Sequence, residues 1–333
     1  MAVAIASISP GRGLRCNASK VAFRSRSVAP KRRVCAVSIA NGFLVLAVLG
    51  LITYTMMSRS GDALRHMGLD FFTSRRWNPP ARQYGILSYI YGTIFTAVIA
   101  LTLSVPVSLG IALFMTQIAT PRLKRWLGTV IDLLAVVPSV VFGLWGVLVL
   151  ARHIDGLYRW LSSTFHSWPI LGTFFGGQPQ GKSFLTAGLV LAVMITPIIV
   201  SLSREVIDTT PQYEKEAALA LGATRWEMIR GSVLPHSKGG LVGAVMLGLG
   251  RAMGETIAVA LVIGSATGSI TLNALAPGNS MPAVITAEWP EADQLKKSAL
   301  IAMAMTLFLI TILVNIAATA IVNRSMKKSR GAA

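Results

Sequence analysis

Six long apolar runs divide this chain. They occupy approximately residues 37–57, 87–115, 129–150, 184–202, 241–263 and 299–322. Each has about the length that an α-helix needs to cross the hydrocarbon core of a bilayer, roughly 20 residues. Pro106, Pro138 and Pro197 lie inside these runs, and membrane helices tolerate such kinks where neighbouring helices satisfy the freed backbone groups. The pattern predicts an all-α polytopic membrane protein with six transmembrane helices.

The polar connection between the fourth and fifth runs, residues 203–238, has a helical pattern of its own. Residues 214–221 are rich in alanine and leucine, with acidic side chains at the start, and Gly222 is a typical helix stop. Residues 224–234 predict a second short helix that Pro235 closes. Long connections are usually functional, so we expect a partner protein to dock here. The alternative is a plain spacer.

The composition agrees with a membrane protein. Hydrophobic residues make up 53% of the 333 residues and charged residues 13%, which is far from the average soluble domain. The net charge of +18 could indicate nucleic acid, but the basic residues flank apolar runs and form no stripe with aromatic residues, so no nucleic-acid partner is expected. Cys16 and Cys35 are the only cysteines, which excludes a disulfide framework and a cysteine-based metal site. No cofactor is expected.

Residues 1–36 form a basic segment that contains no acidic residue. Two interpretations stay open. One is a cytoplasmic tail whose positive charge keeps the first helix oriented. The other is a cleavable transit segment, which would place the protein in a chloroplast envelope rather than in the cell (inner) membrane.

The lysine and arginine residues also predict an orientation. With both termini in the cytoplasm, the connection at 121–127, the segment 203–238 and the C-terminal tail are cytoplasmic and hold most of the basic residues. The positive-inside rule accepts this arrangement and rejects its inverse. If residues 1–36 are removed, the two sides become nearly equal, and the prediction then depends on the short basic connection at 121–127.

The fifth run contains the strongest candidate chemistry. Arg251 and Glu255 are four residues apart, which on an unbroken helix brings their charged groups within reach of each other. Charges at this depth are costly and by default face an internal path or a partner, and the arginine fork suits an oxyanion such as phosphate. The alternative is a structural salt bridge between subunits. Asp132 is either a further candidate partner or a plain carboxylate at the membrane interface. A neighbouring face carries small residues every four positions, which would let a second helix approach closely: Gly240, Ala244, Gly248, Ala252 and Thr256.

Three further segments carry weaker signals. Residues 176–183 match the phosphate-binding P-loop pattern, but an apolar run follows instead of a soluble helix, so we discount nucleotide binding. Residues 69–79 alternate aromatic residues with arginines, which suits a segment lying at the membrane interface. The half-apolar stretch 281–287 is too short to span a bilayer and is expected either to dip into the outer leaflet or to lie at its surface.

Two motifs carry a resemblance to a known family. Glu216, Ala217, Ala218, Gly222, Leu234 and Pro235 resemble the EAA docking loop of ABC-importer permeases, with Ser232 where that family has isoleucine. The stretches 246–256, 133–146 and 277–280 resemble the C-type permease subunit of phosphate-specific ABC importers. The resemblance covers roughly residues 40–322.

This resemblance implies a type I ABC-importer permease, not an enzyme, that translocates inorganic phosphate. The implied partners are a sibling six-helix permease, a cytoplasmic ATP-binding subunit dimer, an extracytoplasmic phosphate-binding protein and membrane lipid. Arg251 and Glu255 are then the residues of the substrate pathway, and the EAA residues contact the ATPase. Alternatives are a permease for sulfate or molybdate, a secondary carrier and a non-transporting scaffold or sensor.

The predicted organisation has four parts. They are a basic tail or transit segment over 1–36, the first transmembrane helix with its external loop over 37–86, the permease domain over 87–322 and a basic cytoplasmic tail over 323–333.

Overall fold

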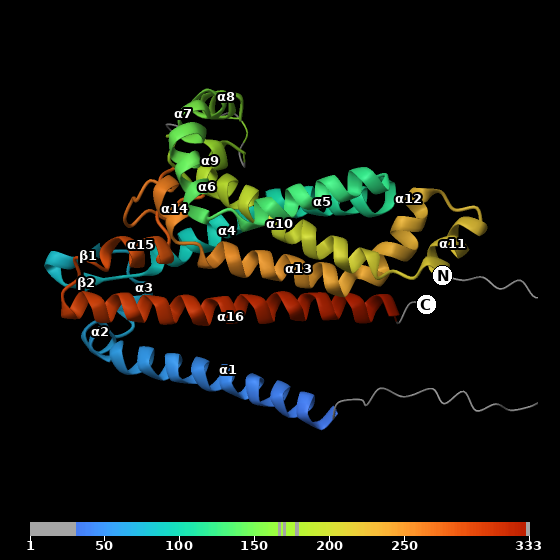
Figure 1. Cartoon of the computed structure of the whole chain (residues 1–333). Coiled ribbons are helices and arrows are strands. Elements are labelled where there is room, and N and C mark those ends of the chain that lie inside the picture. Colours follow the sequence, from blue (N-terminus) through green and yellow to red (C-terminus); the bar gives the residue numbers. More distant parts are fainter. Residues whose placement is uncertain (1–30, 166–167, 169–170, 177–179, 331–333) are drawn as a thin grey trace, which may run out of the picture. The chain divides into compact units, whose positions relative to one another are not determined.

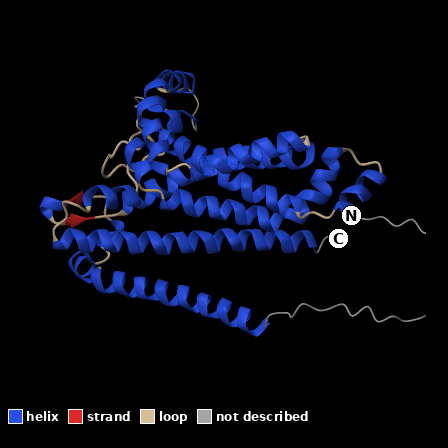
Figure 2. Ribbon diagram, viewed as in Figure 1, coloured by secondary structure: helices blue, strands red, loops and turns tan. Residues whose placement is uncertain are grey.

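A computed structural model describes residues 31–165, 168, 171–176 and 180–330. The chain divides into two compact units, Met1–Ile52 and Thr53–Ala333, which are described separately. Most of the predicted basic tail, and with it the question of its cleavage, lies outside the described residues. Within them, the regular elements are helices apart from one two-stranded hairpin (Figure 2).

Four of the six predicted apolar runs are single helices. They are α1 (Lys31–Arg59), α4 (Leu87–Leu113), α10 (Phe184–Asp208) and α16 (Gln294–Arg330). In the described part of the chain these four have the length and apolar composition to cross a membrane. Pro106 and Pro197 lie inside α4 and α10 without ending either helix. The last helix continues through residues 323–330, which the sequence predicted as a separate tail.

The third run is not one straight helix. It divides into α5 (Pro121–Val136) and α6 (Ser139–Trp145), and the helices on the two sides of the break are bent by 90°. Pro138 causes the break, because the residue before a proline is pushed out of the α-helical region and proline donates no backbone hydrogen bond. If this bent pair is one span, the described chain has five candidate spans.

The fifth run is also broken, and its helix starts earlier than predicted. The first part, α13 (Leu234–Gly254), ends before Glu255, which has extended backbone angles, and α14 (Ile257–Val262) follows. Pro235 does not close the preceding helix. It lies in the first turn of α13, directly after the π-helical turn η4 (Ile229–Val233), where a missing backbone N–H is tolerated.

The remaining elements are short and connect the long helices. They are α2 (Gly61–Met67), α3 (Asp70–Thr73), β1 (Trp77–Asn78), η1 (Pro79–Ala81), β2 (Gln83–Tyr84), η2 (Phe114–Ile118), η3 (Gly146–Leu150), α7 (Ala151–His153), α8 (Asp155–Phe165), α9 (Leu171–Phe175), α11 (Gln212–Ala220), α12 (Arg225–Met228) and α15 (Met281–Glu288).

Within the unit 53–333, α10 is the central helix. It packs against α4, α5 and α13 and contributes more buried residues to the main apolar core than any other helix (Figure 1). Glycines allow the close approach: a side chain at Gly240 would collide with Val206, and one at Gly248 with Ile199. The predicted face of small residues is therefore confirmed as a helix-packing face from Gly240 to Ala252, and its partner is α10 of the same chain. Its last member, Thr256, lies beyond the end of α13 and is not on this face.

The end of this unit that carries the β1–β2 hairpin is built around buried aromatic side chains. Phe71, Trp77 and Tyr84 are buried together with Met281 and Val284 of α15. Phe71 and Trp77 are thus core residues. That the segment 69–79 lies at the membrane interface stays a prediction, with Leu69 and Phe72 as its exposed apolar side chains. The α15 segment also packs inside the bundle, where the Met281 backbone N–H donates to Thr93 Oγ1 of α4 at 2.9 Å.

The segment that matches a P-loop has a different structural role. Residues 177–179 lie outside the described residues. Ser183 is the N-cap of α10, and its hydroxyl accepts a hydrogen bond from the Thr186 backbone N–H at 3.3 Å. In the described part of the chain, the helix α9 precedes this segment, and not the strand that a nucleotide-binding P-loop requires.

Candidate functional site

The helix α13 has two faces with different surroundings. The small residues Ala244, Gly248 and Ala252 are buried against α10. Gly243, Leu247 and Arg251, also four residues apart, are exposed on another face. Because 3.6 residues make one turn, this spacing keeps each set on one side of the helix. Arg251, the candidate cation of the fifth run, is therefore on the exposed face of α13.

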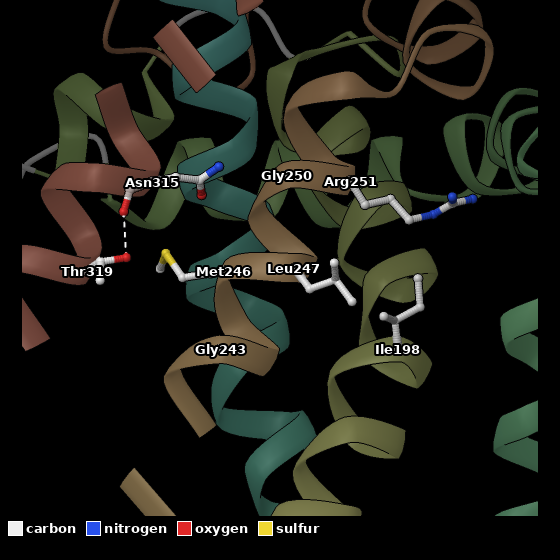
Figure 3. Close-up of a pocket in the computed structure, with 8 residues that line it drawn as sticks. All are labelled: Ile198, Gly243, Met246, Leu247, Gly250, Arg251, Asn315 and Thr319. Atoms are coloured by element: carbon white, nitrogen blue, oxygen red, sulfur yellow. Dashed lines mark hydrogen bonds between the residues drawn. The ribbon is translucent and has the colours of Figure 1, made fainter. Parts of the chain in front are cut away.

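Arg251 lines a groove of about 630 Å³ on this exposed face (Figure 3). Gly243 and Gly250 of α13 form part of it, with Ile198 from α10 and two polar residues, Asn315 and Thr319, from α16. No side chain of the described chain lies within 4 Å of where a Cβ would stand at either glycine. The groove is consequently open along α13 and bordered by two other helices.

Arg251 and Glu255 do not form the ion pair that their spacing predicted. In the described part of the chain, Arg251 has no carboxylate within 4 Å. The reason is the end of α13 at Gly254. The extended backbone of Glu255, with φ −73° and ψ 128°, takes its side chain out of the helical register. The structure leaves Arg251 exposed and buries Glu255.

Glu255 instead faces the start of the next helix. Its Oε1 accepts a long hydrogen bond of 3.4 Å from the Ala258 backbone N–H, and its side chain is 7% exposed. Burial of a carboxylate without a counter-ion is costly. The Glu255 carboxylate therefore lies at the helix break. It is four residues from Arg251 in the sequence, but within the described residues the two side chains form no ion pair.

Asp132, the other candidate partner of Arg251, pairs elsewhere. Its carboxylate lies 3.6 Å from the Arg204 guanidinium and accepts a hydrogen bond from Ser201 Oγ at 3.2 Å. Nearer the start of α5, Lys124 Nζ lies 2.8 Å from Asp208 Oδ2 of α10. These two ion pairs join α5 to α10, so Asp132 has a packing role between helices.

Sequence reasoning missed the polar residues of α16 that line the groove. Asn315 Oδ1 is buried and has no hydrogen-bond partner in the described structure, and Thr319 Oγ1 donates to the Asn315 backbone carbonyl at 2.8 Å (Figure 3). Asn315 is the one amide side chain in the predominantly apolar run 299–322. It was a signal that the sequence offered, because strongly polar residues inside membrane helices are costly and often functional.

The predicted docking loop forms two short helices separated by a glycine turn. The first, α11, ends as predicted at Gly222, which has a φ of +86°. Glycine adopts this left-handed conformation without the steric cost that a side chain imposes. The second, α12, starts with a capping box in which the Glu227 backbone N–H donates to Thr224 Oγ1 at 3.3 Å and the Thr224 backbone N–H donates to Glu227 Oε2 at 2.7 Å. The hydrogen bonds that the Glu227 carboxylate accepts from the Thr224 backbone N–H and from the Thr224 hydroxyl lower its pKa.

The loop brings the two halves of the EAA motif together. Ala217, Ala218 and Leu221 line one side of a depression of about 550 Å³, and Ser232 and Pro235 line the other. Ala218 and Leu234 pack against a buried cluster that includes Val233 and Ile207. The His236 ring lies 3.5 Å from the Glu214 carboxylate, which joins α11 to the first turn of α13. Glu216 is exposed and accepts a hydrogen bond from Gln212 Nε2 at 3.2 Å.

The outer surface of this loop exposes large apolar side chains. Leu221 is 90% exposed, Tyr213 70% and Trp226 62%. In Figure 1 the loop, with α11 and α12, lies at the end of the 53–333 unit opposite the β1–β2 hairpin. A rigid, helical surface of this kind is typical of a protein interface.

Relatives of known name match almost the whole chain. The chain is 41% identical over 290 residues to the phosphate transport system permease protein PstC of Xylella fastidiosa, covering 87% of this chain and 89% of that protein. It is 39% identical over 292 residues to the PstC of Haemophilus influenzae, covering 86% and 91% of the two chains. It is also 41% identical over 293 residues to PstC 2 of Mycobacterium tuberculosis, covering 86% and 89%.

Solved structures share the fold. A bacterial ABC transporter involved in the import of alginate aligns with a TM-score of 0.57 at 14% identity, covering 88% of this chain and 98% of that one. The MetNI methionine ABC transporter aligns with a TM-score of 0.52 at 17% identity, covering 75% and 99%. At these identities the likeness concerns the fold alone.

The family described as binding-protein-dependent transport system inner membrane component matches residues 107–327. This match, the relatives and the long apolar helices agree with one another. The chain is a multi-pass membrane protein, and it belongs to the family of binding-protein-dependent transport system inner membrane components.

Proposed function

We propose that this chain is a permease subunit of an ATP-driven importer that moves inorganic phosphate across the cell (inner) membrane. The observation that carries the proposal is the 41% identity, over 87% of the chain, to permease proteins named for phosphate transport. An arginine in an open membrane groove agrees with an anionic substrate. The chain itself hydrolyses nothing, and ATP hydrolysis belongs to a separate subunit.

The proposed topology has six membrane spans with both termini in the cytoplasm. The bent pair α5–α6 and the broken pair α13–α14 are the third and fifth spans. Interrupted membrane helices are tolerated where they line a cavity, which agrees with the position of Arg251 and Glu255 beside the break. The distribution of lysine and arginine supports this orientation.

The proposed mechanism is alternating access driven from the cytoplasmic loop. The ATPase subunits grip the EAA residues Glu216, Ala217, Ala218 and Gly222 on α11 and its turn, and Leu234 and Pro235 at the start of α13. Arg251 follows Pro235 by sixteen positions on one helix, which corresponds to about 24 Å. Because α13 is one unbroken helix between these residues, a movement of the loop also moves the groove.

In the groove, Arg251 attracts the phosphate. Glu255, which is buried at the helix break and does not line the groove, is proposed to belong to the same substrate pathway. The groove is bordered by α10 and α16 and is otherwise open in the described part of the chain, so we propose that the sibling permease closes the path on the open side. The external binding protein delivers phosphate at the opposite end from the ATPase. The domain division proposed from the sequence, with the permease domain over 87–322, fits this arrangement.

Uptake by reconstituted vesicles tests the proposal. The chain is co-expressed with its sibling, ATPase and binding protein, and ATP-dependent accumulation of labelled phosphate is measured. An excess of sulfate or molybdate should compete weakly, whereas strong competition would favour a permease for another oxyanion. Uptake that needs no ATPase would instead indicate a secondary carrier.

The membrane that holds the protein is tested separately. The curated relatives named above are bacterial proteins, which supports the cell membrane. The chloroplast alternative depends on a cleaved segment within residues 1–36. Sequencing the mature N-terminus decides between them: an intact basic segment supports the proposal, and cleavage near residue 36 opposes it.

A further inference from the structure

An open pocket containing two arginines lies beside the β1–β2 hairpin. Arg75, Arg76 and Gln83 line it from the hairpin, and Thr267 and Gly268 line it from the loop between α14 and α15. The pocket measures about 470 Å³. The proposed mechanism does not use it, and the proposed orientation puts it on the extracytoplasmic side.

The hairpin gives these arginines a rigid support. Trp77, directly after Arg76, is 8% exposed, and its ring packs edge-on against Tyr84 and Tyr89 with centroids 5.2 and 5.5 Å apart. The Trp77 indole N–H donates to Glu288 Oε2 at 2.9 Å. A charged residue on a fixed backbone loses less freedom on binding than one on a flexible loop, so the support favours recognition.

Arg75 and Arg76 are both exposed residues. In the described part of the chain neither Arg75 nor Arg76 has a carboxylate within 4 Å. The nearby Glu288 carboxylate is already paired with Lys296 Nζ at 3.0 Å. The pocket therefore presents uncompensated positive charge to the outside.

The far wall of the pocket belongs to the loop that follows the broken fifth span. Gly268 lies against the Arg75 carbonyl. Two hydrogen bonds of 3.0 Å hold this loop, from the Ala266 backbone N–H to the Gly278 carbonyl and from the Gly278 N–H to the Ile263 carbonyl at the end of α14. Whatever fills the pocket consequently touches a segment joined directly to the helices beside Arg251.

We propose that this pocket is a docking point for an acidic side chain on the extracytoplasmic binding protein. The inference rests on the proposed function, which supplies that partner, and adds the surface on which it sits. Complementary charge accelerates association and orients the partner. The docked protein would also contact residues 267–268, and a shift of this segment would move α14, to which it is joined.

A protein carboxylate fits the site better than a free ion. The arginines are exposed, and an isolated ion gains little from exposed charges that solvent and salt screen. A docked protein adds many other contacts and excludes water around the charge pair. Binding of inorganic phosphate alone is the competing outcome, and the experiment below measures it separately.

The test measures association of the purified phosphate-binding protein with the complete complex in lipid nanodiscs. The double variant Arg75→Glu/Arg76→Glu should lower the association rate about tenfold, and Arg75→Lys/Arg76→Lys should retain most of it. Arg82→Glu is the matched control: it reverses a charge on the same hairpin outside the pocket and should change the rate less than twofold. Each complex is first checked for assembly.

Each outcome has one meaning. If the wild-type complex does not bind the binding protein, the proposed function fails. If it binds and the Arg75/Arg76 reversal has no effect, or Arg82→Glu has the same effect, the docking pocket is wrong. Inorganic phosphate is titrated without the binding protein as a second arm, and a phosphate signal that the reversal removes while protein docking persists would also overturn the inference.

Discussion

At the scale of single residues, the charged pair of the fifth run separates into two different environments. Arg251 is exposed in a groove, and Glu255 is buried at a helix break. Within the described residues of this chain the two side chains are not bonded to each other. A structural salt bridge with another subunit stays the alternative role, and an assembly measurement separates it from a role in the substrate pathway.

Arg251→Ala should abolish phosphate uptake while the complex still assembles, because the residue packs against little of its own chain. Arg251→Lys should restore only part of the activity, since lysine keeps the charge but lacks the bidentate fork. Uptake by vesicles and co-purification of the partner subunits measure the two properties. Loss of assembly with Arg251→Ala would indicate a packing role instead.

Asn315 belongs to the same groove and gives a second prediction. Asn315→Leu should lower phosphate uptake by about tenfold or more. The variant loses the hydrogen bond that the Asn315 amide would form with phosphate in the groove, and a hydrogen bond to a charged group contributes about 1.5–3 kcal/mol. Thr311→Val is the matched control. Its hydroxyl donates to the Leu307 carbonyl of its own helix at 2.8 Å, and it does not line the groove. Equal loss in both variants would show that any polar group in α16 matters, and not the groove.

At the scale of elements, the docking loop was predicted better than the helix that follows it. The alanine-rich helix and the stop at Gly222 are confirmed, since local propensity and a left-handed glycine decide both. The end of the second helix at Pro235 was wrong. A π-helical turn lets the chain continue into α13, and the helix gains tertiary packing that sequence rules do not include.

Gly222→Asp should uncouple ATP hydrolysis from transport without removing the protein from the membrane. A side chain in this left-handed conformation costs about 1–2 kcal/mol, and the new carboxylate lies on the surface proposed for the ATPase. Gly156→Asp is the control, because that glycine is helical and has open space around its Cβ position. Retained phosphate uptake in Gly222→Asp would remove the coupling proposal.

At the scale of the whole unit 53–333, one packing face determines where the groove can be. The small residues of α13 lie on α10, and this contact leaves Leu247 and Arg251 on the open side. The position of the cation is therefore a consequence of helix packing far more than of its own interactions.

Gly248→Leu should destabilise the protein by about 1–3 kcal/mol through overpacking against Ile199. The double variant Gly248→Leu/Ile199→Ala should recover part of the loss, because the second change frees space at the same contact. Thermal unfolding in detergent measures both. A Gly248→Leu protein as stable as the wild type would show that α13 and α10 are less closely packed than described.

The sequence by itself determined the membrane class, the four continuous helices, the small-residue packing face and the glycine turn of the docking loop. Each of these depends on composition, periodicity or one residue's backbone preference, which act over a few neighbouring positions. It also singled out Arg251 and Glu255 as candidates.

Only the tertiary structure decided that Arg251 and Glu255 lie in different environments. The same is true of the ion pair between Asp132 and Arg204 and of the burial of Phe71 and Trp77 in the core. Helical spacing assumes an unbroken helix, and the break at Glu255 depends on packing between distant segments. The same holds for the groove with Asn315 and for the arginine pocket, whose walls come from parts of the chain about 190 residues apart. Contacts across such separations leave no periodic signal in a single sequence.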